Sequence, residues 1–394
     1  MTKPQRTDTD WKTAVARGAS VVFWLAAWQA ASWVMAQPLI LPGPFEVVLV
    51  LGDAVVRSSF WTAVGFSAAR IAGALVTAYV FALPAAFLAH RIPAVRVLFA
   101  PPLQAIKATP VVCVVVLLLL WLGSANVSFA AVLLMALPGL YFTTLEGLAH
   151  QDVRMTELFD VHGVCGARRA LALTWQQVLP YVRAASANVV GMAWKAGVAA
   201  ELIGVPIGSI GERIYQSKLL IETADVLAWT IVVIALSAAC ERIVLALLRA
   251  SGPASVRLAI RLRRTSDARR TSDASGASNS GQAVVFVAPG AIELRDVRPP
   301  YEGFDHDISL SVAGGRRVCL TGPSGQGKTT TLRIVAGLLR PAAGTYYIPA
   351  RRAMLFQESR LIEDASALQN ILLFAAPEVD EAATRAALHL SLIH

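Results

Sequence analysis

The fold is decided by the stretch Gly322-Pro323-Ser324-Gly325-Gln326-Gly327-Lys328-Thr329-Thr330. It fits the pattern G-x-x-x-x-G-K-[ST] of a phosphate-binding loop. We expect residues 317–320 before it to form a buried strand and residues 331–336 after it a helix, so that backbone N–H groups and the helix dipole face a phosphate chain. Lys328 is then expected to reach the β- and γ-phosphates, and the Thr329 hydroxyl to bind Mg²⁺. A tight glycine-rich turn without a ligand is the alternative.

The composition indicates a membrane protein with a soluble attachment. The chain has 394 residues, of which 56% are hydrophobic and only 15% charged, and its mean hydropathy is +0.57. This is too apolar for an ordinary soluble protein. We expect the net charge of +9 to reflect basic cytoplasmic loops and not nucleic-acid binding. The phosphate-binding loop lies far downstream of the apolar part, which predicts a membrane domain followed by a nucleotide-binding domain.

Apolar runs predict about six membrane spans, so that the membrane domain is mostly α-helical. They cover residues 18–36, 62–89, a stretch ending near residue 122, 127–147, 182–205 and 226–248. Lys and Arg gather in the N-terminal tail, after the second and fourth spans, and beyond residue 250. The positive-inside rule therefore places the N-terminus, the loop at 150–181 and the nucleotide-binding domain in the cytoplasm.

The same patterns predict four regions along the chain. They are a cytoplasmic N-terminal tail at 1–17, the membrane domain at 18–250, a linker at 251–282 and the nucleotide-binding domain at 283–394. The linker lacks aromatic residues, is rich in Ser, Arg, Ala and Gly, and contains an exact six-residue tandem copy starting at Arg263. We expect a flexible tether beside anionic membrane lipids, with a span of roughly 30 Å.

The loop at 150–181 carries Glu157, Gly166 and, near its end, Val178-Leu179-Pro180. This arrangement resembles the coupling loop of ATP-binding-cassette (ABC) importer permeases. Leu158-Phe159 stands where that family has two alanines, and Gly166 lies one residue further from the proline than usual. The pattern of the loop itself predicts two short amphipathic helices with a glycine break, a surface that would suit docking of a cytosolic partner. An ordinary interfacial loop is the alternative.

Two further runs, at 41–48 (Leu-Pro-Gly-Pro-Phe-Glu-Val-Val) and 193–202 (Ala-Trp-Lys-Ala-Gly-Val-Ala-Ala-Glu-Leu), resemble the nitrate, sulfonate and taurine branch of these permeases. The resemblance covers about residues 18–248 and implies a type I importer permease in the bacterial plasma (inner) membrane. It implies a periplasmic substrate-binding protein, and a second copy of the chain or a partner permease or ATPase. A small anion is the implied substrate, and a thiamine-precursor pyrimidine is the alternative substrate.

Arg70, Lys195 and Glu201 are ionisable residues inside predicted spans. Such groups usually face a cavity or one another. Because a spacing of six does not place Lys195 and Glu201 on one helix face, no direct pair between them is predicted. A basic lining would suit an anion pathway, and structural ion pairs with other helices are the alternative.

Residues 283–287, 292–294 and 308–312 are expected to form strands that precede the phosphate-binding loop. Residues 291–375 resemble the ABC ATPase domain, an α/β P-loop fold that uses ATP and Mg²⁺. By this resemblance, Tyr301 stacks on adenine, whereas a surface tyrosine is the alternative. Residues 354–358 (Met-Leu-Phe-Gln-Glu) resemble the Q-loop, in which Gln357 would contact Mg²⁺ and the attacking water.

The resemblance does not extend to a complete ABC ATPase. The sequence after Gln357 contains no L-S-G-G-Q signature, no Walker B strand with a glutamate, and no switch histidine. The last residues, Leu390-Ser391-Leu392-Ile393-His394, can be encoded by the start of a transposon mosaic-end adapter used in sequencing libraries. We therefore expect a truncated ATPase domain and assign no catalytic residue. A permease with a non-catalytic, regulatory nucleotide-binding tail is the alternative.

Overall fold

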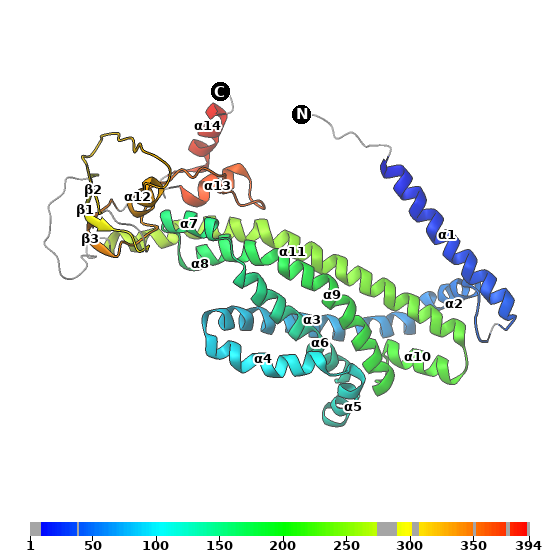
Figure 1. Ribbon diagram of the computed structural model, residues 1–394. Coiled ribbons are helices and arrows are strands. Elements are labelled where there is room, and N and C mark those ends of the chain that lie inside the picture. Colours follow the sequence, from blue (N-terminus) through cyan, green and yellow to red (C-terminus); the bar gives the residue numbers. More distant parts are fainter. Residues whose placement is uncertain are drawn as a thin grey trace. The chain divides into compact units, whose positions relative to one another are not determined.

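The computed structural model describes residues 9–37, 39–273, 290–301, 307–349, 352–375 and 379–391. The chain divides into two compact units (Figure 1). The first unit consists of Met1–Glu146 and Tyr181–Leu247, and the second of Gly147–Pro180 and Leu248–His394. The two boundaries that follow Pro180 and Leu247 fall inside long helices.

The first unit is built from helices. They are α1 (Thr9–Met35), α2 (Pro44–Val56), α3 (Ser58–Arg91), α4 (Pro93–Ala108), α5 (Val111–Leu122), most of α6 (Val127–Ala149), most of α9 (Trp175–Gly204), α10 (Ile210–Leu219) and the first half of α11 (Thr223–Asp273). Proline opens two of these helices, at Pro44 and Pro93, where its missing N–H costs no hydrogen bond. Gly123, with φ 73°, ends α5.

Four helices of the described chain are long and apolar enough to cross a membrane. They are Gly18–Met35, Ser58–Arg91, Val127–Ala149 and Thr223–Leu262. The pair α4 and α5 would add a fifth if the two form one broken span, since they meet at a bend of 107°. Helix α9 covers the predicted fifth span but carries Arg183, Lys195 and Glu201 and is not among these four. The count of six spans stays a prediction.

The predicted span that ends near residue 122 corresponds to two helices that meet at a sharp bend, and it stays a prediction. Helix α5 has 12 residues, too few to cross a bilayer alone. The backbone of Pro110 is extended and separates α5 from α4. The prediction assigned this span only an end, near residue 122, and did not locate the break at Pro110.

The predicted flexible tether is also corrected in its first part. Helix α11 runs without interruption over 51 residues, so that residues 251–273 are helical. Val256 and Ala259 are fully buried and Ile260 is half-buried, which gives this polar sequence one short apolar face. Average composition does not show such a face, whereas packing against it supplies most of a helix's stability. Residues 274–282 of the tether lie outside the described residues.

The second unit mixes helices with one small sheet. Its remaining elements are α7 (Val153–Val161), α8 (Gly166–Arg169), a π-helical turn (Ala170–Thr174), β1 (Ile292–Arg298), β2 (Ile308–Val312), α12 (Lys328–Val335), β3 (Ala343–Tyr347), α13 (Ala367–Phe374) and α14 (Glu381–Ser391). The sheet has the order β2-β1-β3, and both pairs are antiparallel. Leu294 of β1 lies opposite Leu310 and Tyr346. Leu294 and Val297 pack with Ile334 of α12 in a small core.

Two of the three strands predicted before the phosphate-binding loop, at 292–294 and 308–312, are confirmed, and the third, at 283–287, lies outside the described residues. The prediction of a buried strand at 317–320 is wrong. In the described part of the chain no strand pairs with this segment, and Val318 is 55% exposed. A buried strand needs backbone partners along its edges, and the antiparallel sheet offers none here. The described part of the predicted α/β domain is thus an antiparallel sheet with helices α12 to α14.

Candidate functional site

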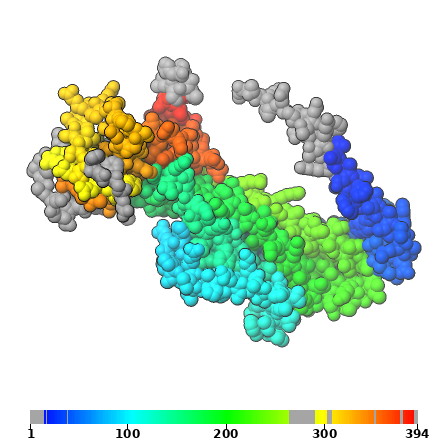
Figure 2. Space-filling model, viewed as in Figure 1, coloured from blue at the N-terminus to red at the C-terminus, as the bar shows by residue number. Residues whose placement is uncertain are grey.

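The phosphate-binding loop lies at the surface of the second unit, in the region coloured gold in Figure 2. Gly322, Gly325 and Gly327 have φ values of 148°, 90° and 80°, which favour glycine. A Cβ atom on Gly322 would lie 2.4 Å from Oε1 of Gln326. Gly327 is the N-cap of α12, so the predicted helix after the loop is confirmed. This turn presents backbone N–H groups to an anion, as a nucleotide phosphate requires.

Lys328 closes the loop in this structure. Its Nζ donates hydrogen bonds of 2.7 Å to the carbonyl oxygens of both Gly322 and Pro323. Thr329 is exposed and Thr330 half-buried in the first turn of α12. They are the last two residues of the predicted nucleotide-binding motif. The ammonium group of Lys328 therefore lies at the loop, where it could contact a bound phosphate. The positions of Lys328 and Thr329 fit ATP with Mg²⁺.

Tyr301 and Gln357 are not brought to the loop by the described contacts. Tyr301 is 50% exposed and Gln357 is exposed. Among the hydrogen bonds of the described residues, none joins either side chain to residues 322–330. Their roles toward adenine and Mg²⁺ stay predictions.

The coupling segment, which we define as residues 152–180, begins with a capped helix. Asp152 precedes α7 and accepts a hydrogen bond of 2.8 Å from the backbone N–H of Arg154. Gly163 and Gly166, with φ 62° and 61°, form the predicted break between α7 and α8. The second helix does not stop at Pro180, because α8 continues through the π-helical turn into α9, and Pro180 lies inside α9. Only the first half of the predicted two-helix loop is a separate short helix.

Glu157 is held between two arginines that the sequence did not single out. Its Oε1 accepts a hydrogen bond from Nη2 of Arg333, and its Oε2 accepts one of 3.0 Å from Nη1 of Arg360. Arg360 also donates 2.6 Å to the carbonyl oxygen of Arg154 and lies 3.4 Å above the ring of Phe356. The side chains of Glu157 and Arg360 are only 15% and 13% exposed. Desolvated, charge-assisted contacts of this kind are strong.

These contacts join the coupling segment to the phosphate-binding loop through one helix. Arg333 belongs to α12, whose first residue is Lys328. Arg360 lies just after Gln357 in the chain. Both arginines that hold the Glu157 carboxylate thus come from segments next to predicted nucleotide-binding residues.

Weaker polar contacts surround this centre. Arg154 pairs with Glu358 at 2.5 Å, but the two side chains are 63% and 58% exposed, so the pair contributes little. Arg168 donates a hydrogen bond of 2.9 Å to the carbonyl oxygen of Leu373. The rings of Phe159 and Phe374 meet edge to face at 5.0 Å.

An apolar core lies under these polar contacts, and we call it the docking core. Three parts of the chain contribute to it: the coupling segment, α11 and the residues after Gln357. Its buried members are Phe159, Val164, Ala172, Leu173, Val256, Ala259, Ile362 and Leu373. No sequence pattern pointed to Arg333 or Arg360, because only the fold brings them to Glu157. Nothing in the sequence pattern indicated the contribution of α11.

In the first unit, Glu201 is fully buried. Its Oε2 accepts hydrogen bonds of 2.6 Å from the Ser67 hydroxyl and 3.3 Å from the backbone N–H of Gly211. The Ser67 oxygen in turn accepts 2.9 Å from the N–H of Ile210, at the start of α10. These hydrogen bonds join α3, α9 and α10, so Glu201 has a structural role in holding the three helices together. The structure shows hydrogen bonds to another helix at Glu201 where the alternative interpretation expected an ion pair.

The other two candidate pathway residues lie elsewhere on these helices. Arg70 is half-buried with its guanidinium 4.2 Å above the ring of Phe66. Lys195 is exposed, whereas Glu201 of the same helix is buried, as expected for positions that do not share a face. No ion pair joins any two of the three within the described residues.

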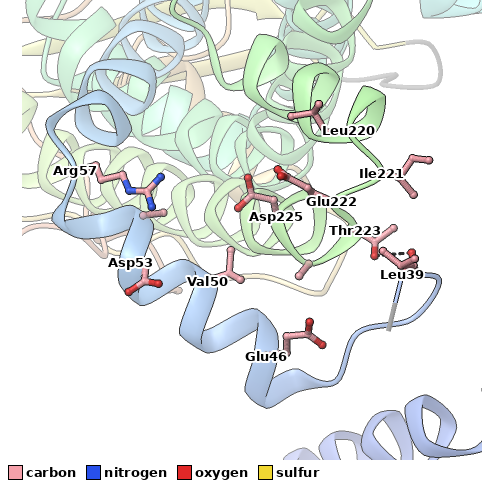
Figure 3. Close-up of a pocket in the computed structure, with 12 residues that line it drawn as sticks. Leu39, Glu46, Val50, Asp53, Arg57, Leu220, Ile221, Glu222, Thr223 and Asp225 are labelled. Carbon is pink, nitrogen blue, oxygen red and sulfur yellow. Dashed lines mark hydrogen bonds between the residues drawn. The ribbon is translucent and has the colours of Figure 1, made fainter. Parts of the chain in front are cut away.

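A pocket of about 480 Å³ opens elsewhere in the first unit, between α2 and the turn before α11 (Figure 3). Its lining includes four carboxylates, from Glu46, Asp53, Glu222 and Asp225, and the guanidinium of Arg57. Figure 3 shows Asp225 and Glu222 on the α11 side of the pocket, across from Asp53 and Glu46 of α2. No sequence pattern predicted this pocket.

Comparisons with known proteins match the last part of the chain. The family model described as ABC transporter matches residues 306–394. Aliphatic sulfonates import ATP-binding protein SsuB of Granulibacter bethesdensis is 47% identical over 66 residues, which are 17% of this chain and 28% of that protein. Fe(3+) ions import ATP-binding protein FbpC of Rhizobium etli is 38% identical over 101 residues, 22% of this chain and 29% of the relative.

A third relative is named for a different substrate. Thiamine import ATP-binding protein ThiQ of Shigella boydii is 38% identical over 91 residues, 20% of this chain and 39% of that protein. The chain thus spans less than two fifths of each of these relatives. Residues 306–394 therefore carry an ABC ATPase domain similar to those of importers, for which ATP is the implied nucleotide.

Proposed function

We propose that this chain is an importer subunit in which ATP binding by the second unit drives transport through the first. The ATPase relatives, the apolar helices and the coupling segment support this proposal. The observation that carries it is the Glu157 carboxylate, held by Arg333 of the helix that begins at the phosphate-binding loop and by Arg360. A nucleotide-binding domain with no transport partner has no use for such a link.

The proposed coupling follows from these contacts. The phosphate-binding loop offers its backbone N–H groups to the phosphates, and Lys328 exchanges its two carbonyl partners for phosphate oxygens. Thr329, and by resemblance Gln357, would hold Mg²⁺. Hydrolysis of the bound ATP would supply the free energy for the cycle, and this chain's own residues would bind and position the nucleotide. Helix α12 carries Arg333, so its displacement pulls on Glu157 and thereby on α7.

The membrane arrangement and the partners are part of the same proposal. The distribution of Lys and Arg supports a multi-pass protein of the bacterial inner membrane with a cytoplasmic N-terminus and ATPase domain. A periplasmic substrate-binding protein and a second copy of the chain, or a partner subunit, would complete the transporter. A small anion such as a sulfonate, taurine or nitrate is the proposed cargo, with Arg70 and Lys195 as candidate pathway residues.

The cargo is supported by the permease-like runs and not by the ATPase relatives. Those relatives are named for sulfonates, Fe(3+) and thiamine, so their similarity does not distinguish among cargoes. Arg70 carries a positive charge inside α3, which suits an anion better than a cation.

Uptake into proteoliposomes tests the function. The full chain is reconstituted with a candidate binding protein and a complete partner ATPase subunit, and uptake of labelled taurine is measured with and without ATP, with thiamine as a competing cargo. We expect ATP-dependent uptake that Glu157→Lys abolishes while binding of a fluorescent ATP analogue persists. Nucleotide binding without ATP-dependent uptake of any cargo would refute the proposal and favour a regulatory nucleotide-binding tail.

A further inference from the structure

We infer that residues 251–260 of α11 form a docking element that holds the ATPase domain on the coupling segment of the same chain. This element lies beyond the most apolar part of α11, and Figure 1 shows α7 and α8 beside this end of the helix. The inference goes beyond the proposed function, in which coupling runs through Glu157 of α7 and no residue of α11 has a role. It concerns whether the ATPase domain of the same chain, or that of another subunit, binds the coupling segment.

Polar contacts join the docking element to the coupling segment. Nε2 of Gln176 donates hydrogen bonds of 2.7 Å to the carbonyl oxygen of Gly252 and 2.8 Å to the hydroxyl of Ser255. Nε1 of Trp175 donates one of 3.2 Å to the hydroxyl of Ser251. One side of α11 is therefore fixed to the start of α9.

The same turn of α11 touches the ATPase domain. A Cβ atom on Gly252 would lie 2.4 Å from Oδ2 of Asp364 and 3.2 Å from Cδ2 of Leu179. The absence of a side chain at this position lets α11 approach both neighbours at one point. Asp364 follows Ile362, a member of the docking core, so this contact continues into apolar packing.

The apolar face completes the contact. Val256 and Ala259 are fully buried and share the docking core with Phe159 of the coupling segment and with Ile362 and Leu373 of the ATPase domain. Three segments of one chain thus close one core. Because covalent connection raises the effective concentration of the ATPase domain at this surface, a separate ATPase subunit is at a disadvantage there.

A cleavage experiment tests the contribution of α11. A protease site is placed within residues 274–289 of the full chain, the purified protein is cut in detergent, and retention of the ATPase fragment on the tagged membrane fragment is measured. Ala259→Glu places a carboxylate in the docking core, and we expect it to release at least tenfold more fragment than the unchanged chain. Leu258→Glu is the matched control, since this neighbouring side chain is 47% exposed, and it should retain the fragment. Equal retention in the two variants overturns the inference.

Disulfide cross-linking tests the contact without disturbing the core. The native cysteines are first replaced by serine at positions 113, 165, 240 and 319. Gly252→Cys and Asp364→Cys, placed in one chain, should then join the two fragments after the same cut, because their Cβ atoms fall near disulfide range. Coexpressed chains that carry one cysteine each should give no cross-linked product.

Each outcome of this second test decides something. Cross-linking only between coexpressed chains would show docking between two copies and overturn the same-chain assignment. No cross-linking in either case would overturn the contact itself. Neither readout depends on transport, so failure of the proposed function leaves this inference standing and the reverse also holds.

Discussion

Replacement of Glu157 by alanine is expected to weaken docking of the ATPase domain more than any other single polar change in the coupling segment. The substitution removes the acceptor of two guanidinium groups, of which Arg360 is 13% and Arg333 39% exposed. Arg360 keeps its hydrogen bond to the carbonyl oxygen of Arg154 and its position over Phe356. It nevertheless loses its only carboxylate partner among the described residues in a largely buried position.

The size of the effect follows from this exposure. Breaking a buried ion pair by removing one partner costs about 3–5 kcal/mol. Arg333 is more than a third exposed and contributes little of this. We therefore expect a loss of about 3 kcal/mol, or roughly a 100-fold weaker association.

The cut chain described above provides the assay. Retention of the ATPase fragment is measured as a function of fragment concentration for the unchanged chain, Glu157→Ala and Glu358→Ala. The last variant removes the exposed Arg154–Glu358 pair and is expected to change the free energy of association by less than about 1 kcal/mol. If both variants weaken association equally, the buried Glu157 contacts do not dominate docking and the reasoning from burial is refuted.

Three further predictions concern the loop and the membrane helices. Lys328→Ala should lower affinity for a fluorescent ATP analogue at least tenfold, because the loop loses its ammonium group; unchanged affinity would mean that nucleotide does not bind at this loop. Gly322→Ala should weaken the same binding and lower stability by about 1 kcal/mol, because its φ of 148° disfavours a side chain, whereas an unaltered melting temperature would show that the loop rearranges freely. Glu201→Leu should lower the melting temperature in detergent, since the Ser67 hydroxyl and an N–H of α10 lose their acceptor at a cost of about 1–3 kcal/mol each. The exposed Lys195→Leu is its control, and equal shifts for both variants would contradict the structural role of Glu201.

Local patterns were sufficient to predict some elements. Strands β1 and β2 alternate apolar and polar residues, and α12 follows a glycine-rich motif with fixed spacing. The break before α8 was predicted because glycine marks a left-handed backbone, as the φ of Gly166 shows. In each case the information lies within a few neighbouring residues.

The other features depend on partners distant in the sequence. The helical course of α11 past residue 251 depends on Val256 and Ala259 finding apolar neighbours in two other segments. Arg333 and Arg360 become site residues only because docking brings Glu157 between them. Conversely, residues 317–320 have strand-forming character, but no described strand pairs with them. Contacts between segments that are distant in the sequence determine these features, and the local pattern of a single sequence does not predict such contacts.

Helix α11 is uninterrupted from Thr223 to Asp273. Its length therefore sets the direction in which its side chains point, whereas the length of a flexible tether does not. Each residue added or removed ahead of the docking element turns the face that carries Val256 and Ala259 by about 100° around the helix axis. An addition of seven residues restores the face to within roughly 20°, whereas an addition of two turns it to the opposite side. If α11 joins a membrane helix to the ATPase domain as proposed, that junction must be correct in rotational phase as well as in reading frame.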